Sequence, residues 1–385
     1  MNSNTIRILA LIIPVLAVVA VLGAMYLKYR LNNAPDNGNL EHALDLEVKK
    51  IIDKGLSHGL VVGVYKDRKS FTKGYGTVRQ ESITTPDGTT IFQIGSITKL
   101  FTDSIYQILA DEKAFDMDAR LNDAIGRNIE LSARAKEVTL RQLASHTSGF
   151  PSIPKPLEVA ATKLVKAEDL TQNPYGHLGP EYIFDYLKTT EDKREPGRFK
   201  YSNFGMGLLG HVLEAIAKKD LETLVVEKLL ASLDMKSTVI TLTPQLKKNL
   251  AQGYTDKGEP NPIWTFKALA GAGAFNSNAD DMLKFIRANI ETENFPISQS
   301  LVRTHELQPN GKANIGWMQP TLIDRFVGNN SIVWHNGMVG GYASYISVDT
   351  RNKTGVIVLS NKSVDVTMLG TMLTRKVRTQ SWATQ

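Results

Sequence analysis

A serine and a lysine, Ser96 and Lys99, lie three residues apart at the start of a segment whose apolar residues repeat at helical spacing. Residues i and i+3 share one face of a helix, so the lysine amine can reach the serine hydroxyl. An amine that is desolvated by a protein core has a lowered pKa and can act as the base that activates a nucleophile. The pair therefore predicts a hydrolase that works through an acyl-serine, with Gly95 allowing a sharp turn just before the serine.

The Ser-x-x-Lys spacing also occurs at Ser70 and at Ser152, and such a pair is more often a helix N-cap followed by a surface lysine. Ser70 lies in a short strand-like segment, and Pro154 keeps the Ser152 stretch out of a helix. Only Ser96 is followed by a long amphipathic helix, which has apolar residues at Ile97, Leu100, Phe101, Ile105, Ile108 and Leu109. The context therefore favours Ser96 as the nucleophile.

Tyr201 and Asn203 form the only Tyr-x-Asn sequence in the chain, immediately before a predicted helix. A phenol close to a cationic lysine could have its pKa lowered and relay a proton to a leaving group. The asparagine amide can hold both the lysine and a substrate carbonyl. Taken alone, the tripeptide also fits a packed loop tyrosine with an asparagine cap, but its occurrence together with Ser96 favours a catalytic role.

His-x-Gly occurs at His177 and at His335, and only the second follows an apolar, strand-like run. There, Gly337 fits a strand edge over which a substrate backbone could lie closely. His177 falls in a proline-rich stretch that we interpret as a surface loop. A Lys-Thr-Gly sequence at Lys353 falls in the turn of the last predicted hairpin, after the strand that should follow a catalytic motif.

The composition excludes several classes of function. The chain has 385 residues, 42 % of them hydrophobic, enough for a substantial core, and no cysteine for disulfides, thiol catalysis or thiolate metal ligation. The formal net charge of +6 is scattered without a basic stripe, so no nucleic-acid partner is expected. No Gly-x-Ser-x-Gly typical of α/β-hydrolases occurs. The histidines lack ligand spacing, so neither a metal nor another cofactor is expected; they lie at positions 42, 58, 146, 177, 211, 305 and 335.

The N-terminus differs from the rest of the chain. Ile8 to Leu27 is an uninterrupted run of 20 uncharged, mainly apolar residues, long enough to cross a bilayer. Arg7 precedes it and Lys28 and Arg30 follow, so flanking charge does not fix its orientation. A cleaved signal peptide is the alternative, but the run is long for one and lacks a clear cleavage site. We expect an uncleaved anchor over residues 1–30 and a polar linker over 31–39.

The remaining pattern predicts an α/β fold. Strands are expected near both chain ends, and helices dominate between them, so one antiparallel sheet should be built from both termini with helices flanking it and an all-helical lobe inserted. The predicted globular domain covers residues 40–375, with its α/β part at about 40–95 and 265–375 and its helical lobe at about 96–264. The expected strands are 60–65, one ending at 75, 332–335, 342–348 and 356–359. The expected helices include 121–143, 205–218 and 221–233, and 150–180 should be irregular with one short helix.

The three motifs, in this order, resemble those of the serine β-lactamase-like superfamily, in the branch of class C β-lactamases, D-alanyl-D-alanine carboxypeptidases and esterases. The resemblance covers about residues 40–370 and implies a β-lactamase/transpeptidase-like fold. Three further segments are similar to stretches of that branch: 143–150, 270–282 and 315–317.

The resemblance implies a role for each motif residue. Ser96 would attack an acyl carbonyl, Lys99 and Tyr201 would share the proton transfers, and Asn203 would position them. The backbone N–H groups of Ser96 and Met338 would form the oxyanion hole. His335 stands where class C β-lactamases carry a lysine, and a neutral or partly charged imidazole is a weaker partner for a substrate carboxylate. His146 is expected to be structural.

The expected protein is a membrane-anchored acyl-serine hydrolase of the cell envelope, most closely a D-alanyl-D-alanine carboxypeptidase acting on a small acyl or peptide substrate. A D-amino-acid esterase or amidase, or a weak class C-like β-lactamase, remains an alternative. A tethered protein that binds cell-wall peptide without turnover is the non-enzymatic alternative. The expected location is the bacterial cytoplasmic membrane, with a single span and the catalytic domain outside the cytoplasm.

Overall fold

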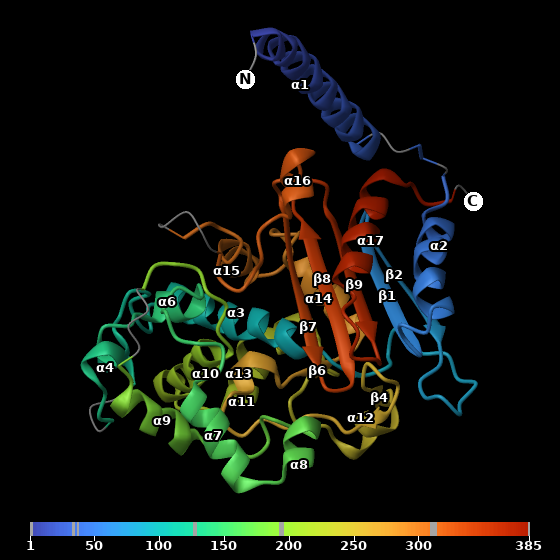
Figure 1. The fold of residues 1–385 in the computed structure, drawn as a ribbon. Helices are drawn as coiled ribbons and strands as arrows, with labels where there is room; N and C mark the ends of the chain where they lie inside the picture. The colour runs from blue at the N-terminus through green and yellow to red at the C-terminus, as the bar shows by residue number, and fades with distance from the viewer. Residues whose placement is uncertain are drawn as a thin grey trace.

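The fold is organised around a five-stranded antiparallel sheet with the strand order β2-β1-β9-β8-β7 (Figure 1). The computed structural model describes residues 3–32, 35–36, 38–125, 129–191, 196–308 and 314–383. Two strands come from the N-terminal part of the chain and three from its C-terminal part, so the sheet joins both, as the sequence predicts. Its strands are β1 (Gly59–Lys66), β2 (Lys69–Gly76), β7 (Ile332–Val339), β8 (Tyr342–Asp349) and β9 (Thr354–Ser360).

Tight turns set the register of this sheet. Asp67 and Arg68 both have positive φ, 53° and 62°, as expected for a two-residue hairpin loop between right-twisted strands. At the β8–β9 turn, the buried Asp349 carboxylate accepts hydrogen bonds from the backbone N–H groups of Arg351 and Asn352, both at 3.2 Å. These turns align the strands so that alternate side chains face opposite layers.

One face of the sheet is covered by α2 (Leu40–Asp53) and α17 (Thr367–Thr379). Their apolar stripes pack on the strand residues that point to this side, with Leu44 and Leu373 fully buried. The cluster continues through the sheet residues Leu60, Val62, Val64, Tyr345, Val356 and Val358.

The other face packs against α3 (Thr98–Asp111), α14 (Ala279–Ala288) and a group of helices from the middle of the chain (Figure 1). That group contains α4 (Leu121–Ala124), α5 (Ala133–Lys136), α6 (Leu140–Ala144), α7 (Lys155–Leu164), α8 (Ala167–Gln172), α9 (Pro180–Thr189), α10 (Asn203–Ala217) and α11 (Leu221–Val225). The smaller elements are β3 (Phe92–Gln93), β4 (Gly253–Tyr254), β5 (Pro260–Asn261), β6 (Asn276–Ser277), α12 (Pro244–Lys248), α13 (Ala270–Gly273), α15 (Ser298–Arg303) and α16 (Leu322–Phe326).

The prediction of one continuous helix over residues 121–143 is wrong. The segment forms three short helices, of which α5 and α6 each begin at a side-chain cap. Ser132 accepts a hydrogen bond from the backbone N–H of Ala135, and Thr139 forms a capping box with Gln142. Residues 150–180 hold two short helices, α7 and α8, rather than the expected one. The proposed domain division stays a prediction.

The N-terminal helix α1 (Ser3–Asn32) includes the run predicted to span a membrane. Side chains are described only for Ile13 and residues 16–29 of it, so residues 8–12, 14 and 15 of that run lie outside the described side chains. Among the described residues, no helix combines the length and the apolarity needed to cross a bilayer. The span is therefore not confirmed and stays a prediction.

The packing of α17 gives a test of the fold. Replacing Leu373, whose side chain is fully buried against the sheet, in Leu373→Ala should lower the free energy of unfolding by about 2 to 5 kcal/mol. On the same helix, Met368 is mostly exposed, so Met368→Ala should change it by about 0.5 kcal/mol or less. Urea unfolding of both variants measures this; equal losses would contradict the described packing of α17.

Candidate active site

Ser96 and Lys99 lie where a short 3₁₀ turn, Gly95–Ile97, runs into α3. The lysine Nζ is hydrogen-bonded to Ser96 Oγ at 3.0 Å and donates to the Ala272 carbonyl at 2.6 Å. Lys99 is fully buried. The structure therefore brings the predicted serine and lysine together, and the carbonyl of α13 orients the amine toward the hydroxyl.

Burial controls the charge of this lysine. Desolvation lowers the pKa of Lys99 to about 7, while the charge of Asp103 acts in the opposite direction. Asp103 follows one helical turn later, is fully buried, and neither of its carboxylate oxygens has a hydrogen-bond partner among the described residues. Burial raises the pKa of Asp103 well above its usual value. The sequence analysis missed this carboxylate, although its i+4 spacing from the lysine was visible.

Tyr201 joins the pair from the loop before α10. Its hydroxyl is hydrogen-bonded to the Ser96 side chain, and Lys99 Nζ lies 4.9 Å from its ring centroid. The sequence led us to expect a lowered phenol pKa, but the structure gives the opposite direction. Burial raises the pKa of Tyr201 and outweighs the hydrogen bond from Ser96. The phenol is therefore a neutral hydroxyl near pH 7, able to donate and accept one proton in turn.

Two buried histidines flank Tyr201, with ring centroids 4.6 Å (His146) and 6.1 Å (His335) from its own. His146 Nδ1 accepts the backbone N–H of Ser202 at 3.2 Å, which fits the structural role expected for it. His335 Nδ1 lies 2.6 Å from the Asn336 carbonyl, so this nitrogen carries the hydrogen and Nε2 is left as an acceptor. Burial lowers the pKa of His335 to about 3. The imidazole is therefore neutral, and the alternative of a partly charged His335 is wrong.

Asn203 lies in the site but does not make the contacts expected of it. Its amide Nδ2 donates to the Tyr175 hydroxyl at 3.2 Å, and its Oδ1 is buried without a partner among the described residues. The free carbonyl oxygen is available to a substrate N–H. Tyr175 stacks on Phe266, with ring centroids 4.9 Å apart.

A small cavity of about 40 Å³ opens beside the nucleophile. None of its described lining residues is charged, and aromatic rings form much of the wall. The lining residues are Ser96, Tyr175, Asn203, Trp264, Phe266, Ala272, Gly273, Met338 and Val339. The aromatic wall was not found from the sequence, because Tyr175, Trp264 and Phe266 belong to no motif and meet only through the fold.

Gly337 brings β7 against the turn that carries Ser96. A Cβ on Gly337 would lie 2.2 Å from the Ile94 carbonyl oxygen and 2.9 Å from Ser96 N. In the facing turn, a Cβ on Gly95 would lie 2.9 Å from Met338 N, and Gly95 has a φ of +53°. Only glycine fits both positions. The backbone amides of Ser96 and Met338 thus lie on the two sides of one close contact, as an oxyanion hole built from them requires.

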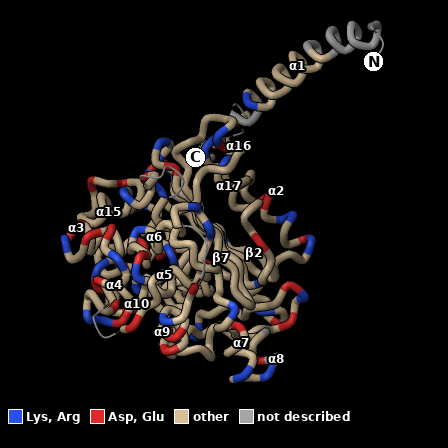
Figure 2. Tube along the Cα trace, turned by 60° about the vertical axis from the view of Figure 1, so that its left-hand side comes forward, with Lys and Arg blue, Asp and Glu red and all other residues tan. Residues whose placement is uncertain are grey.

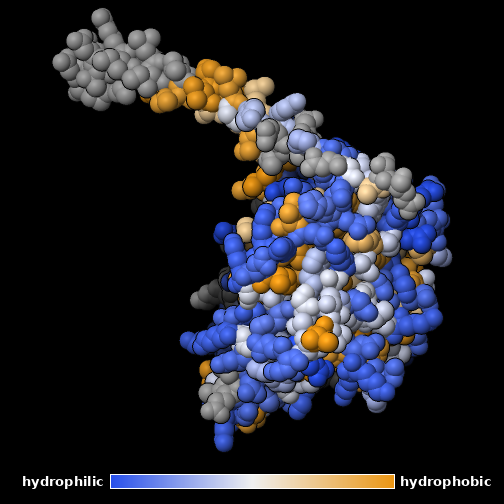
Figure 3. All heavy atoms as spheres, turned by 90° about the vertical axis from the view of Figure 1, so that its right-hand side faces the viewer, coloured by the Kyte–Doolittle hydropathy of each residue, from blue (hydrophilic) through white to orange (hydrophobic). Residues whose placement is uncertain are grey.

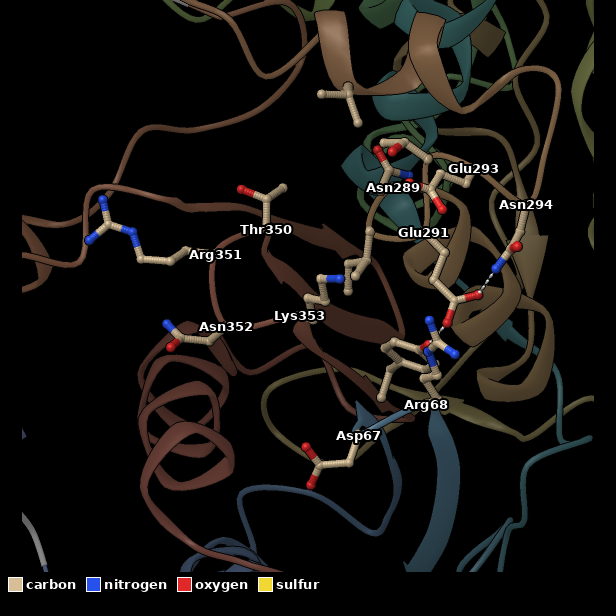
Figure 4. A pocket seen from close by; sticks show the side chains of 14 residues that line it. Asp67, Arg68, Asn289, Glu291, Glu293, Asn294, Thr350, Arg351, Asn352 and Lys353 are labelled. Carbon is tan, nitrogen blue, oxygen red and sulfur yellow. Dashed lines mark hydrogen bonds between the residues drawn. The ribbon is translucent and has the colours of Figure 1, made fainter.

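The competing motifs lie outside this cluster. Ser70 and Lys73 are in β2, where Lys73 forms an ion pair with Asp45 at 2.8 Å. Lys155, the partner of Ser152, begins the surface helix α7. Lys353 lines a separate, larger cavity of about 530 Å³ at the tips of the β1–β2 and β8–β9 hairpins (Figure 4). The structure therefore brings together the Ser-x-x-Lys and His-x-Gly sequences that the sequence context favoured, and their roles stay a prediction.

Comparisons with known proteins place the chain in a family. The chain is 24 % identical to Protein flp of Staphylococcus aureus over 335 residues, covering 83 % of this chain and 63 % of that protein. It thus spans less than two thirds of that relative's length. It is 23 % identical to a beta-lactamase of Pseudomonas fluorescens over 360 residues, covering 84 % of this chain and 94 % of the relative.

Among solved structures, a beta-lactamase/D-alanine carboxypeptidase from Pseudomonas syringae matches with a TM-score of 0.74 at 21 % identity, covering 88 % of this chain and 98 % of the other. A D-alanine carboxypeptidase from Burkholderia cenocepacia matches with a TM-score of 0.72 at 20 % identity and the same coverage. At these identities the likeness establishes the fold. A family model for beta-lactamase matches residues 47–377, so the chain belongs to the beta-lactamase family.

Proposed function

We propose that this chain is an acyl-serine hydrolase that cleaves D-alanyl amide bonds as a D-alanyl-D-alanine carboxypeptidase does. The observation that carries the proposal is the cluster of Ser96, Lys99 and Tyr201, in which a buried amine with a pKa of about 7 contacts the serine hydroxyl. Membership of the beta-lactamase family supports the same chemistry.

The geometry supports a two-step reaction. The neutral Lys99 amine takes the Ser96 proton as Oγ bonds to the acyl carbon, and the oxyanion is stabilised by the N–H groups of Ser96 and Met338. As the intermediate collapses, the Tyr201 phenol gives its proton to the leaving nitrogen and is reprotonated by the Lys99 ammonium. A water molecule then attacks the acyl-enzyme by the reverse proton path and returns Ser96 to its starting state.

The proposed D-alanyl substrate rests on the neighbours. Two solved structures that share this fold are named as D-alanine carboxypeptidases. The free Oδ1 of Asn203 and the aromatic wall beside Ser96 suit a peptide whose backbone N–H is held while its side chain packs on Tyr175.

An esterase or amidase acting on D-aminoacyl groups is the second candidate, and one observation favours it. A carboxypeptidase must hold a free carboxylate, yet His335 is neutral and fully buried, and no charged residue lines the cavity among the described residues. An esterase or amidase whose leaving group carries no charge would not have to bury an unpaired carboxylate in this site, which is energetically costly.

We further propose that α1 anchors the enzyme in the bacterial cytoplasmic membrane, with the catalytic domain on the outer side. The supporting observation is that the large hydrophobic side chains described in α1 are more than half exposed, among them Ile13, Leu16, Val18, Val19, Val21, Leu22 and Leu27. Figure 3 shows this apolar surface standing clear of the more polar body. A helix that is apolar all round requires a membrane or a protein partner to cover it.

The acyl-serine step is tested by intact mass after incubation with benzylpenicillin. We expect an adduct of one penicillin on the purified chain and none on Ser96→Ala, because the lactam carbonyl can be opened only by the Oγ nucleophile. Full substrate turnover by Ser96→Ala would sink the proposal and revive a different catalytic centre. If neither protein reacts with penicillin or with any ester or amide, the tethered binding protein becomes the better account.

Substrate preference separates the two candidates. A carboxypeptidase should release D-alanine from an acyl-D-alanyl-D-alanine peptide. When the C-terminal carboxylate of that peptide is converted to the methyl ester, kcat/KM should fall at least about tenfold, because a carboxylate contact is typically worth over 1 kcal/mol. An esterase should instead prefer the ester, since the neutral His335 offers the carboxylate no cation. The readouts, under matched conditions, are release of D-alanine from the free peptide and release of D-alanine methyl ester (amide cleavage) or methanol (ester cleavage) from the methyl ester.

The pH profile tests the role of Lys99. A base must be unprotonated, so acylation should fall about tenfold per pH unit below the lysine pKa of about 7 and be independent of this group above it. Because the charge of Asp103 raises that pKa, Asp103→Asn should move the acidic limb of kcat/KM to lower pH, by about one unit or less.

Asp111→Asn is the matched control, since Asp111 is at the far end of α3 and pairs with Arg303 at 2.7 Å. This variant should leave the limb in place. An acidic limb that does not move in Asp103→Asn would mean that Asp103 stays protonated throughout and does not influence the lysine.

A further inference from the structure

One end of the catalytic body carries exposed apolar and basic side chains together. Leu322, Ile323 and Phe326 of α16 are 85 %, 50 % and 41 % exposed. Outside α1, no other helix or strand in the described ranges exposes three large hydrophobic residues. With these residues we group the exposed cations of α16 and of the two neighbouring hairpin turns and call the set the anchor-side surface: Leu322, Ile323, Phe326, Arg68, Arg325, Arg351 and Lys353.

Contacts with α17 fix this surface at the end of the body from which α1 leaves. Arg375 of α17 bonds the buried Asp324 carboxylate of α16 at 3.0 Å, so the polar side of α16 faces inward and its apolar side outward. Arg378, one turn on, forms an ion pair with Asp349 at 3.4 Å, at the start of the turn that carries Arg351 and Lys353.

The chain that follows α1 is attached at the same place. The backbone N–H of Ser381 donates to Asp36 Oδ1 at 2.9 Å, and Gln380 Nε2 donates to the Pro35 carbonyl at 2.7 Å. Figures 1 and 2 both show α16 and the end of α17 beside the lower end of α1. The stretch predicted as a polar linker over residues 31–39 is held against the C-terminal segment at Pro35 and Asp36, and α1 lies next to α16.

The cations of the surface are not neutralised by ion pairs. Arg68, Arg325, Arg351 and Lys353 form none with any described residue. Arg325 does donate hydrogen bonds to two neutral acceptors, the Pro320 carbonyl at 3.1 Å and the Gln319 side chain, and keeps its charge. Acidic groups are present as well: Asp67, Glu291 and Glu293 line the same cavity as Arg68 (Figure 4).

These acidic groups do not neutralise the whole set. Glu291 is engaged by Arg287 at 2.7 Å, and Asp67 lies 3.9 Å from Lys66. The side chain of Arg351 points away from Glu291 and Glu293 in Figure 4. Arg325 on α16 and Arg351 are thus left to face outward.

We propose that the anchor-side surface rests on the anionic phospholipid bilayer that holds α1, with Leu322, Ile323 and Phe326 entering the interface and the four cations meeting lipid phosphates. The inference depends on the membrane anchoring proposed above. A short apolar helix face with basic neighbours is the pattern of an interfacial membrane contact. A second copy of the chain is the other possible cover, but four like charges on a self-complementary contact would repel each other.

The absence of cysteine allows a direct test on the full-length chain. Ile323→Cys is labelled with the polarity-sensitive fluorophore NBD, and the chain is reconstituted into phosphatidylcholine vesicles with or without phosphatidylglycerol. Gln245→Cys, on the exposed helix α12 at the opposite end of the body, is the matched control. Flotation with the vesicles is measured in parallel and reports on anchoring by α1 separately.

We expect NBD at position 323 to shift to shorter wavelength and brighten several-fold in vesicles that contain phosphatidylglycerol, and NBD at position 245 not to change. The triple variant Arg68→Glu, Arg351→Glu, Lys353→Glu should lose the response and still float. A chain that floats with position 323 still water-exposed would overturn the surface and leave the anchor standing. A chain that does not float would overturn both, and a response that depends on protein concentration without vesicles would assign the surface to a second copy.

Discussion

The structure depends on keeping the Lys99 amine out of water while giving it hydrogen-bond partners. A buried ammonium is costly, and the site reduces this cost by lowering the pKa of the lysine and by placing the Ala272 carbonyl at 2.6 Å. That carbonyl reaches the amine because glycine lets α13 lie close to α10: a Cβ on Gly271 would lie 2.9 Å from the Met206 carbonyl oxygen. The glycine-rich α13 is thus as much a part of the site as the Ser-x-x-Lys motif.

Burial acts on the titratable groups around Ser96 in one consistent direction, toward the uncharged form. It lowers the pKa of Lys99 and of His335 and raises that of Tyr201. Near pH 7 the serine, the lysine and the phenol therefore start uncharged, and charge separates only when Lys99 takes the Ser96 proton and the oxyanion forms in a medium of low polarity. The same neutrality limits the substrate, because a site without a fixed cation offers little to an anionic leaving group.

A feature could be predicted from the sequence where local residue spacing determines it, and could not where it depends on tertiary contacts. Ser96 and Lys99 are three residues apart, and the periodic helix behind them distinguished them from Ser70, so the pair was predicted. The strands were predicted because alternation and turn residues are local signals. Tyr175 belongs to no motif. Ala272 lies in the segment 270–282 that resembles the family, but the contact of its carbonyl with Lys99 depends on tertiary packing that the segment itself does not show. The predicted direction of the Tyr201 pKa shift was wrong, because the sequence shows that a cationic lysine could lie close to the phenol but does not show that the fold desolvates the phenol.

The sheet that unites both chain ends also connects the site to the proposed anchor. β1 pairs with β9, so the segment that follows α1 packs directly on strands from the C-terminal third. Arg375 and Arg378 in the last turns of α17 then bind Asp324 and Asp349, and Ser381, just after α17, binds Asp36. These contacts fix three separate segments at one end of the body. Because β7 belongs to the same sheet and carries Gly337, the place where Pro35 and Asp36 are held is fixed relative to the nucleophile. A tether joined in this way would set the orientation of the site toward its substrate as well as its distance from the membrane.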